Sequence, residues 1–409
     1  MSLRNLSGFF WSPIIIYIFM IKYLQNKKWI VVIAATLLSS CEIEKKYEVL
    51  HTANPKTIEE NIPYDKVVDS YKYIPLENNP KCVIGEIKNL LIANDLFYVV
   101  SEGVYCFNMD GKFLFAINKK GHAKSEYVDV YSVNVTGNRL YLYDNSQWKI
   151  LVFDALSGKY IETIDIPYSA FLVYGGQERL LLDRCNLPNT EVPNNERFLV
   201  CSTQSPQKTL DCFLPQDILR NSCHIENTTT INSDGFLCTD FWGNTIWKVT
   251  PNSAQCYFKI NLPTNKSLPY EKLKLLEEKG EIFLDDFPDG KYWGLTHAQE
   301  SEHFITGQLM SMNGPAFFIY DKDSSKVIVY TGMSKKEGWK PVPAYLSATY
   351  KDSFFSIRSA DEFCMLRLPE NSIAGPSESE DEQNASKIYN SIQETDNPII
   401  IQFEFKHIK

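Results

Sequence analysis

"VYCFNMDGKFLFAI" (104–117) places two alternating apolar runs on either side of a short polar turn that contains Asp110 and Gly111. "ILVFDALSGKYIETI" (150–164) repeats this order of apolar run, polar turn with glycine, and second apolar run. Alternation at a period of two is typical of half-buried strands, and a glycine-containing turn between two such runs indicates a β-hairpin. Both stretches therefore predict antiparallel strand pairs, and their similarity indicates a repeat.

The spacing of equivalent positions supports this repeat. The apolar residues before or within successive turn regions lie 46, 47 and 49 residues apart, at Phe107, Phe153, Val200 and Val249. A period near 47 residues with four short strands is the sequence signature of a propeller blade. In the first period, the four strands are expected at "IKNLLIA", "LFYVVS", "VYCFN" and "KFLFAI" (87–117).

Two longer intervals are explained by insertions. The next equivalent residues are Tyr320 and Phe403, after 71 and 83 residues. The segment at about 264–290 has helical spacing, and the segment at about 361–396 is acidic, rich in serine and partly helical. Without these segments both intervals return to about one period. The sequence therefore predicts an all-β fold, a six-bladed β-propeller over residues 67–409 with two helical insertions.

The sixth period lacks an outermost strand. Its third strand is expected in "NPIIIQFEFK" (397–406), and the strand-like "SYKYIPLE" (70–77) stands before the first blade without a partner. An unpaired sheet edge invites association with other chains. We therefore expect the N-terminal strand to close the last blade and complete the ring.

The N-terminus has the features of a targeting segment. Two lysines precede the apolar run "WIVVIAATLL" (29–38), and "LSSC" (38–41) follows. This is the pattern of a bacterial lipobox, in which small residues suit the peptidase and the cysteine thiol receives diacylglycerol. We expect residues 1–40 to be a signal peptide, Cys41 to be lipidated, and residues 41–66 to form a tether. A signal anchor, or a secretory signal peptide with a cysteine at that place by chance, is the alternative.

A further apolar stretch, "FFWSPIIIYIFM" (9–20), has no role in such a signal. Met20 would make a conventional start, so residues 1–19 are interpreted as an over-extended gene start. The alternative is a transmembrane hairpin, but Pro13 and the shortness of the runs disfavour it, because a span needs about 20 apolar residues.

The charge balance excludes one class of partner. The chain carries 41 basic and 50 acidic residues, and without residues 1–40 the balance becomes 37 against 50, a net charge of −13. Because so acidic a domain repels phosphate backbones, no nucleic acid is expected as a partner.

Nine cysteines remain beyond Cys41, and they show neither a CxxC pair nor the Cys/His spacing of a zinc site. Several lie in strand-like runs, where a thiol acts as a small apolar group. We expect buried thiols, with one or two disulfides of an exported protein as the alternative. No cofactor is expected.

The chain resembles the six-bladed β-propeller lipoproteins of Bacteroidota-type bacteria over residues 65–409. Four features carry the resemblance: the lipobox, "YIPLE" (73–77), "FNMDGKFLFAINKKG" (107–121) running on to "SEY" (125–127), and a late helix ending in "DNPIIIQFEF" (396–405). The resemblance implies a propeller at the cell envelope and implies little about activity.

The loop "GHAKSEY" (121–127) corresponds to G-x-G-P-G-E-Y in that family and keeps only the first glycine and the final Glu-Tyr pair. His122 and Glu126 are candidate ligand contacts at the top of the ring. The alternative is a connector between blades whose Glu-Tyr pair hydrogen-bonds its neighbour, and the sequence favours this structural role.

Tryptophan side chains are further candidates, because an indole ring can stack on a sugar. Trp293 and Trp339 flank strand segments in irregular sequence and are the better ligand candidates. Trp242 and Trp247 lie around the hairpin signal Gly243-Asn244, and packing between blades is expected for them.

His297 and His303 are six residues apart, with Glu300 and Glu302 between them. This spacing fits neither a helix-borne pair nor a compact zinc site, although on one strand the two rings would share a face. No metal site is expected here.

The sequence contains no nucleophile elbow, P-loop or HExxH motif. We therefore expect an outer-membrane lipoprotein, facing the periplasm or the cell surface, that binds a glycan, a peptide or an envelope protein. The alternative is a hydrolase or lyase acting on polysaccharide or peptide, with residues from several blades gathered at the channel mouth. Propellers include both enzymes and binding proteins, so the residues at the channel mouth distinguish the two functions. Converging carboxylates and histidines favour an enzyme, and an aromatic surface favours a binding protein.

Overall fold

The chain divides into two units, Met1–Glu48 and Val49–Lys409. A computed structural model gives the fold of the second unit. The structure describes residues 48–184, 196–215, 228–239, 242–269, 272, 287–334, 341–365 and 380–409. The expected signal peptide and Cys41 lie outside the described residues. No helix within the described ranges is long and apolar enough to cross a membrane.

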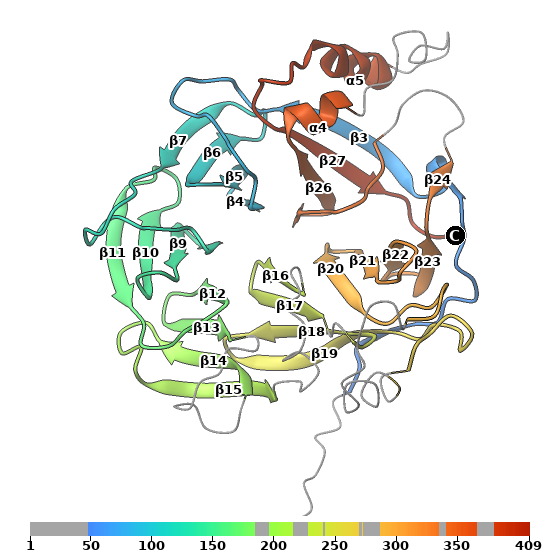
Figure 1. The fold of residues 1–409 in the computed structure, drawn as a ribbon, viewed down its shortest axis with the longest axis horizontal. Coiled ribbons are helices and arrows are strands. Elements are labelled where there is room, and N and C mark those ends of the chain that lie inside the picture. Colours follow the sequence, from blue (N-terminus) through green and yellow to red (C-terminus); the bar gives the residue numbers. More distant parts are fainter. Residues whose placement is uncertain are drawn as a thin grey trace, which may run out of the picture. The chain divides into compact units, whose positions relative to one another are not determined.

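Six antiparallel sheets surround a central axis, as Figure 1 shows. In each of the first five, four strands follow one another from the axis outward. The first blade consists of β4 (Asn89–Ala93), β5 (Leu96–Val100), β6 (Val104–Asn108) and β7 (Phe113–Ile117). The second consists of β8 (Ser132–Thr136), β9 (Arg139–Asp144), β10 (Lys149–Asp154) and β11 (Tyr160–Asp165). The third consists of β12 (Leu172–Gly175), β13 (Arg179–Asp183), β14 (Glu196–Ser202) and β15 (Thr209–Pro215).

The next two blades keep this order and receive short strands from the N-terminal segment. They consist of β16 (Thr229–Asn232), β17 (Gly235–Thr239), β18 (Thr245–Thr250) and β19 (Ser253–Ile260), and of β20 (Leu295–Glu300), β21 (Phe304–Leu309), β22 (Ala316–Asp321) and β23 (Lys326–Tyr330). The strand β1 (His51–Ala53) pairs with β19, and β2 (Ile62–Pro63) pairs with β24 (Met333–Ser334), both in parallel. A 3-10 turn, η1 (Tyr64–Lys66), follows β2. Part of the segment expected as a tether therefore packs on the blades.

The sixth blade joins both ends of the ring. Its strands are β25 (Ala348–Tyr350), β26 (Ser353–Arg358), β27 (Ile399–Phe405) and, outermost, β3 (Val68–Pro75). The N-terminal β3 is antiparallel to β27, with Tyr73 opposite Ile401. The six-bladed fold and its closure by the N-terminal strand are confirmed.

The repeat positions measured in the sequence all lie on the third strand of a blade, and all are buried. They are Phe107, Phe153, Val200, Val249, Tyr320 and Phe403. Because each blade is covered by a neighbour on both faces, its middle strands have little contact with water. This explains why runs such as "LFYVV" in β5 are apolar at every position rather than at alternate positions.

The glycines of the two opening stretches have equivalent roles. Gly111 has φ +78°, and a Cβ there would lie 2.3 Å from the carbonyl oxygen of Pro75, at the end of β3. Gly158 has φ +66°, and its Cβ would lie 2.4 Å from the ring of Phe115 in the preceding blade. Glycine is required at both turns because the backbone is left-handed and the adjacent blade is too close for a side chain.

The later insertion contains two helices, α4 (Ala360–Met365) and α5 (Glu380–Ser391), between β26 and β27. Their aromatic residues cover the outer strand of the seam, where the Phe363 ring lies 5.3 Å from the Tyr73 ring and 5.0 Å from the Tyr389 ring. The segment at 361–396 is therefore partly helical, as predicted. Most of the earlier expected insertion, at 264–290, lies outside the described residues.

The thiols expected to be buried include Cys82, Cys106, Cys201, Cys238 and Cys256, which are buried and not in disulfides. Burial raises the pKa of the Cys106 and Cys201 thiols to about 12. These groups therefore stay protonated at neutral pH and act as small apolar side chains.

The closing role of β3 can be tested by replacing Ile74, which is 3% exposed and packs with Phe97, Phe355 and Ile400 between the last and first blades. We expect Ile74→Ala to lower the free energy of unfolding by about 2–5 kcal/mol, through lost burial and a residual cavity. Urea denaturation measures this. Lys72→Ala, at an exposed position of the same strand, should change it by less than about 0.5 kcal/mol. Equally small effects of the two variants on the free energy of unfolding would contradict the closing role of β3.

Candidate functional site

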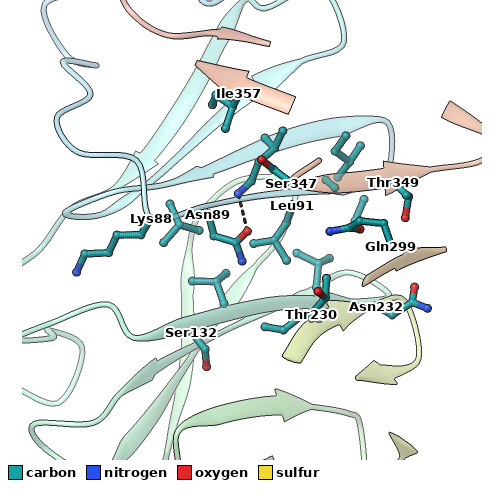
Figure 2. Close-up of a pocket in the computed structure, with 18 of the residues that line it drawn as sticks. Lys88, Asn89, Leu91, Ser132, Thr230, Asn232, Gln299, Ser347, Thr349 and Ile357 are labelled. Atoms are coloured by element: carbon teal, nitrogen blue, oxygen red, sulfur yellow. Dashed lines mark hydrogen bonds between the residues drawn. The ribbon is translucent and has the colours of Figure 1, made fainter. Parts of the chain in front are cut away.

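A channel of about 1570 Å³ runs through the centre of the ring and is the candidate site. Its wall is formed mainly by the innermost strands of the blades, β4, β8, β12, β16, β20 and β25. Successive side chains of a strand point to opposite faces, so each strand exposes only alternate residues to the channel. Figure 2 shows these side chains converging from several blades.

The wall combines small polar groups with aliphatic groups. Several polar side chains also bridge neighbouring strands: Ser132 accepts a hydrogen bond from the backbone N–H of Val173 at 3.1 Å, and the Gln299 amide donates to the carbonyl of Leu346 at 3.4 Å. Figure 2 places Leu91, Ile357, Thr230 and Thr349 among the other residues of the wall.

Three aromatic side chains lie at one mouth of the channel. Tyr131 and Phe171 immediately precede the innermost strands β8 and β12, and Tyr345 precedes β25 by three residues. Because innermost strands of a propeller run in the same direction along the axis, these residues lie at the same mouth. Tyr131 is 39% exposed and Tyr345 is 49% exposed. The Tyr131 and Phe171 rings are 5.7 Å apart and nearly perpendicular.

Two pairs of oppositely charged groups lie beside the mouths. Lys88 contacts Asp129 at 2.8 Å at the aromatic mouth, and Lys351 contacts Asp95 at 2.9 Å in the turn after β4. Hydrogen bonds from Lys351 and Tyr350 hold the pKa of the Asp95 carboxyl below its ordinary value. Both pairs are exposed, so they contribute little to stability and mainly fix the charges in place.

Glu300, at the end of β20, is the most strongly embedded carboxylate of the channel wall. It accepts hydrogen bonds from Asn232 and Lys248, each at 3.1 Å, from Lys322 at 3.4 Å, and from the Tyr257 hydroxyl. Burial opposes its ionisation, but the hydrogen bond from Tyr257 and the two lysines outweigh burial, so its pKa is lowered. Glu300 is therefore an ionised bridge between the fourth and fifth blades.

These shifts limit the chemistry of the channel. A carboxyl group that acts as a general acid near neutral pH needs a raised pKa. Among the described carboxyl groups that line the channel, the two whose pKa departs clearly from its ordinary value are Asp95 and Glu300, and both are lowered. Each of these two carboxylates forms an ion pair with lysine.

The predicted loop residues lie outside the channel wall. His122 is exposed, and the Glu126 carboxylate accepts a hydrogen bond from the backbone N–H of Ala123 at 3.1 Å. Tyr127 is buried, and its hydroxyl donates to the carbonyls of Glu102 and Ile117. The Glu-Tyr pair thus organises a connector between blades, and a ligand role for His122 and Glu126 stays a prediction.

Of the two predicted tryptophans, Trp293 lies outside the channel wall. Trp293 is 5% exposed, and its ring lies 4.5 Å from that of Phe287. Trp339 lies outside the described residues. Trp242, for which packing was expected, is 2% exposed, and its ring stacks on that of Phe287 with the ring centroids 5.9 Å apart.

The aromatic mouth was not predicted from the sequence. The available signal was an aromatic residue directly before the first strand of a blade, which occurs at Tyr131 and Phe171. That signal becomes useful only when the direction of the innermost strands is known.

Comparison with known proteins gives the family. Residues 48–404 match the model described as "Domain of unknown function (DUF4934)". The chain belongs to the DUF4934 family. No protein of curated function shows a significant match to it.

Two solved structures from Bacteroides species match this DUF4934 chain. A Bacteroides fragilis protein named as an exported protein superposes with a TM-score of 0.66 at 15% identity, over 88% of this chain and 100% of that one. A member of the DUF4221 family from Bacteroides vulgatus matches with a TM-score of 0.48 at 12% identity, over 83% of this chain and 97% of that one. At these identities the first match shows a shared fold alone.

The Glu300 bridge of this DUF4934 propeller predicts a pH-dependent stability. The folded-state pKa of Glu300 lies below the ordinary value of 4.5, so its contribution is present above about pH 4.5 and is lost as pH falls through the lowered pKa. We expect Glu300→Gln to cost about 3–5 kcal/mol at pH 7, because it leaves Lys248 and Lys322 without their buried partner.

Urea denaturation across pH measures this contribution. The difference in the free energy of unfolding between Glu300→Gln and the wild-type protein should become smaller below pH 4.5. The matched control is Glu302→Gln, two residues away and exposed, which should have almost no effect. A difference that stays constant down to acid pH would rule out the ionised bridge.

Proposed function

We propose that this protein is a lipid-anchored binding module of the cell envelope, and that it holds a glycan at the aromatic mouth of its channel. The observation that carries the proposal is the position of Tyr131, Phe171 and Tyr345 around a cavity lined by hydroxyl and amide groups. A sugar has apolar C–H faces and polar edges. Exposed aromatic rings suit the faces, and side chains such as Thr230 and Thr349 suit the edges.

The size of the channel supports an oligomeric ligand. Pockets for small molecules usually measure about 300–1,000 Å³, and this channel is about 1570 Å³. A single sugar or metabolite would leave most of that space filled with water. An oligosaccharide that enters from the aromatic mouth would contact several blades at once.

The electrostatics of Asp95 and Glu300 support binding rather than acid catalysis by these two groups. The pKa of both Asp95 and Glu300 is lowered, and each carboxylate has a lysine partner within 3.5 Å. Neither is suited to donate a proton to a leaving group at neutral pH. A neutral ligand would leave these ion pairs undisturbed, because it brings no charge that competes for them.

Two observations support the location. The lipobox pattern "LSSC" (38–41) favours lipidation of Cys41, and the structurally similar Bacteroides fragilis protein is named as an exported protein. In this proposal the ring stands outside the cytoplasm as an outer-membrane lipoprotein, facing the periplasm or the cell surface. There it would meet polysaccharides and their fragments.

The binding proposal is tested with a glycan array, followed by calorimetry on the glycans that bind. Tyr131→Ala and Tyr345→Ala should each weaken binding at least about tenfold, or 1.4 kcal/mol, through loss of a stacking surface. Tyr160→Ala is the matched control, because Tyr160 is 37% exposed but lies on the outermost strand β11.

The same glycans should be incubated with the protein and analysed for cleavage products. Stable binding without cleavage is expected. Cleavage without a measurable complex would favour the hydrolase or lyase instead. If the protein bound peptides but no glycans, and Tyr131→Ala weakened that binding by the same factor, the aromatic mouth would still be the binding site, but its ligand would be a peptide.

The anchor is tested separately. Cys41→Ala removes the only thiol of the lipobox that could receive diacylglycerol. We expect the variant to leave the membrane fraction and to lose incorporation of labelled fatty acid, with the propeller still folded. Cys106→Ala, at a buried position in the first blade, is the control and should stay in the membrane fraction. An unchanged distribution of Cys41→Ala would exclude lipid anchoring at this residue.

A further inference from the structure

Three separate segments bring two histidines and a carboxylate together where the fifth blade meets the end of the chain. His303 lies in the turn from β20 to β21, Asp323 lies in the turn from β22 to β23, and His407 follows β27 of the sixth blade. One potential ligand atom from each residue lies within 4.8 Å of the other two. None of these residues lines the channel.

Two distances within this cluster bracket those of a metal centre, and the separation of its ligand atoms, which reaches at most 4.8 Å, must close when an ion binds. His303 Nδ1 is 2.7 Å from Asp323 Oδ2, and His407 Nδ1 is 3.8 Å from the same oxygen. Zinc binds histidine nitrogen and carboxylate oxygen at about 2.0–2.2 Å, so ligand atoms in a tetrahedral site are about 3.3 Å apart. The distances of 2.7 and 3.8 Å lie on either side of this value.

A buried carboxylate holds the two outer parts of this cluster in position. Asp321, at the end of β22, is fully buried and accepts hydrogen bonds from the backbone N–H groups of Asp323 at 2.9 Å and of Ile408 at 2.8 Å. Its Oδ2 also lies 3.2 Å from His407 Nδ1. Asp321 therefore fixes, through their backbone N–H groups, the turn that carries Asp323 and the segment that carries His407. Binding of an ion through His407 Nδ1 would exchange the contact of that nitrogen with Asp321 for a bond to the metal.

Charge and access also suit a cation. The ammonium group of the neighbouring Lys322 points away from the cluster, donating to the carbonyl of Ser301 at 2.6 Å and contacting Glu300 at 3.4 Å. The side chains of His303 and His407 are 36% and 56% exposed, so an ion from solvent can reach them.

We propose that His303, Asp323 and His407 bind a divalent transition metal ion, with Zn²⁺ as the best match. Two imidazole nitrogens and one carboxylate oxygen suit zinc, whereas Mg²⁺ and Ca²⁺ prefer sites made of oxygen alone. Three protein ligands leave one coordination position for water. The ion joins the C-terminal segment of the sixth blade to the fifth blade and stabilises the ring beside its seam.

This inference replaces the expectation that no metal site is present. Sequence spacing paired His303 with His297, but His297 has φ +51° and its ring lies edge-on against Tyr345 at the channel, 5.8 Å away. The actual neighbours of His303 are distant in sequence. Their contact depends on the closed ring.

The test uses the full-length protein in detergent, without a histidine tag and after treatment with EDTA. Titration with ZnCl₂ in a calorimeter should show one ion bound per chain, and the midpoint of thermal unfolding should rise with zinc concentration. His407→Ala and Asp323→Asn should each weaken zinc binding at least tenfold. His122→Ala removes an exposed histidine elsewhere and should leave zinc binding unchanged.

A second measurement separates ligation from loss of folding. Co²⁺ in place of Zn²⁺ should give the visible absorption of a four-coordinate site in the unchanged protein and in His122→Ala. Asp323→Asn, which keeps the side-chain shape, should lose this absorption while its circular dichroism without metal stays the same. Zinc binding that is equally strong in His407→Ala and Asp323→Asn would overturn the proposal, as would the absence of any one-to-one binding.

Discussion

The antiparallel pairing of β3 with β27 is the constraint on which the structure depends. Residues 68–75 precede the first blade in the chain, yet they form the outer strand of the last blade. The pairing therefore joins the two ends of the propeller and removes an unpaired sheet edge. It also places Ile74 against the first blade and Tyr73 against the helices of the sixth, so one strand contributes to two apolar clusters. A channel of defined width exists only because this seam is closed.

Closure also decides which parts of each blade can act on other molecules. The middle strands are covered on both faces, and their apolar side chains are used for packing between blades. The outermost strands, such as β11, are exposed but face away from the axis. Only the innermost strands and the turns at either end are both accessible and rigidly held. Function is therefore expected at the channel wall, at its mouths and at turns brought together by the ring.

The sequence predicted the fold because the repeat is local. The turns near Gly111 and Gly158, the apolar third strands and the intervals near 47 residues can all be recognised within single blades. The site could not be predicted in the same way, because its members meet only across blades: Tyr131 and Tyr345 are far apart in sequence, and so are His303 and His407. His122 and Glu126 were candidates because of the residue types within their own loop. In the structure, the polar groups of this loop form hydrogen bonds within the loop and with neighbouring residues. Spacing along the chain carries no information about such contacts.

The polar groups of the channel wall divide into two kinds, and this division is the physical basis of the proposed binding role. Glu300, Lys248 and Lys322 hold neighbouring blades together, so moving a proton onto Glu300 would weaken the ring that positions it. The aromatic rings at the mouth carry no charge, so a ligand can contact them without breaking an ion pair between blades. They can exchange water for a ligand without disturbing the blades, and their rigid support keeps the entropic cost of binding low. A propeller of this construction is suited to hold a neutral ligand while remaining unchanged itself.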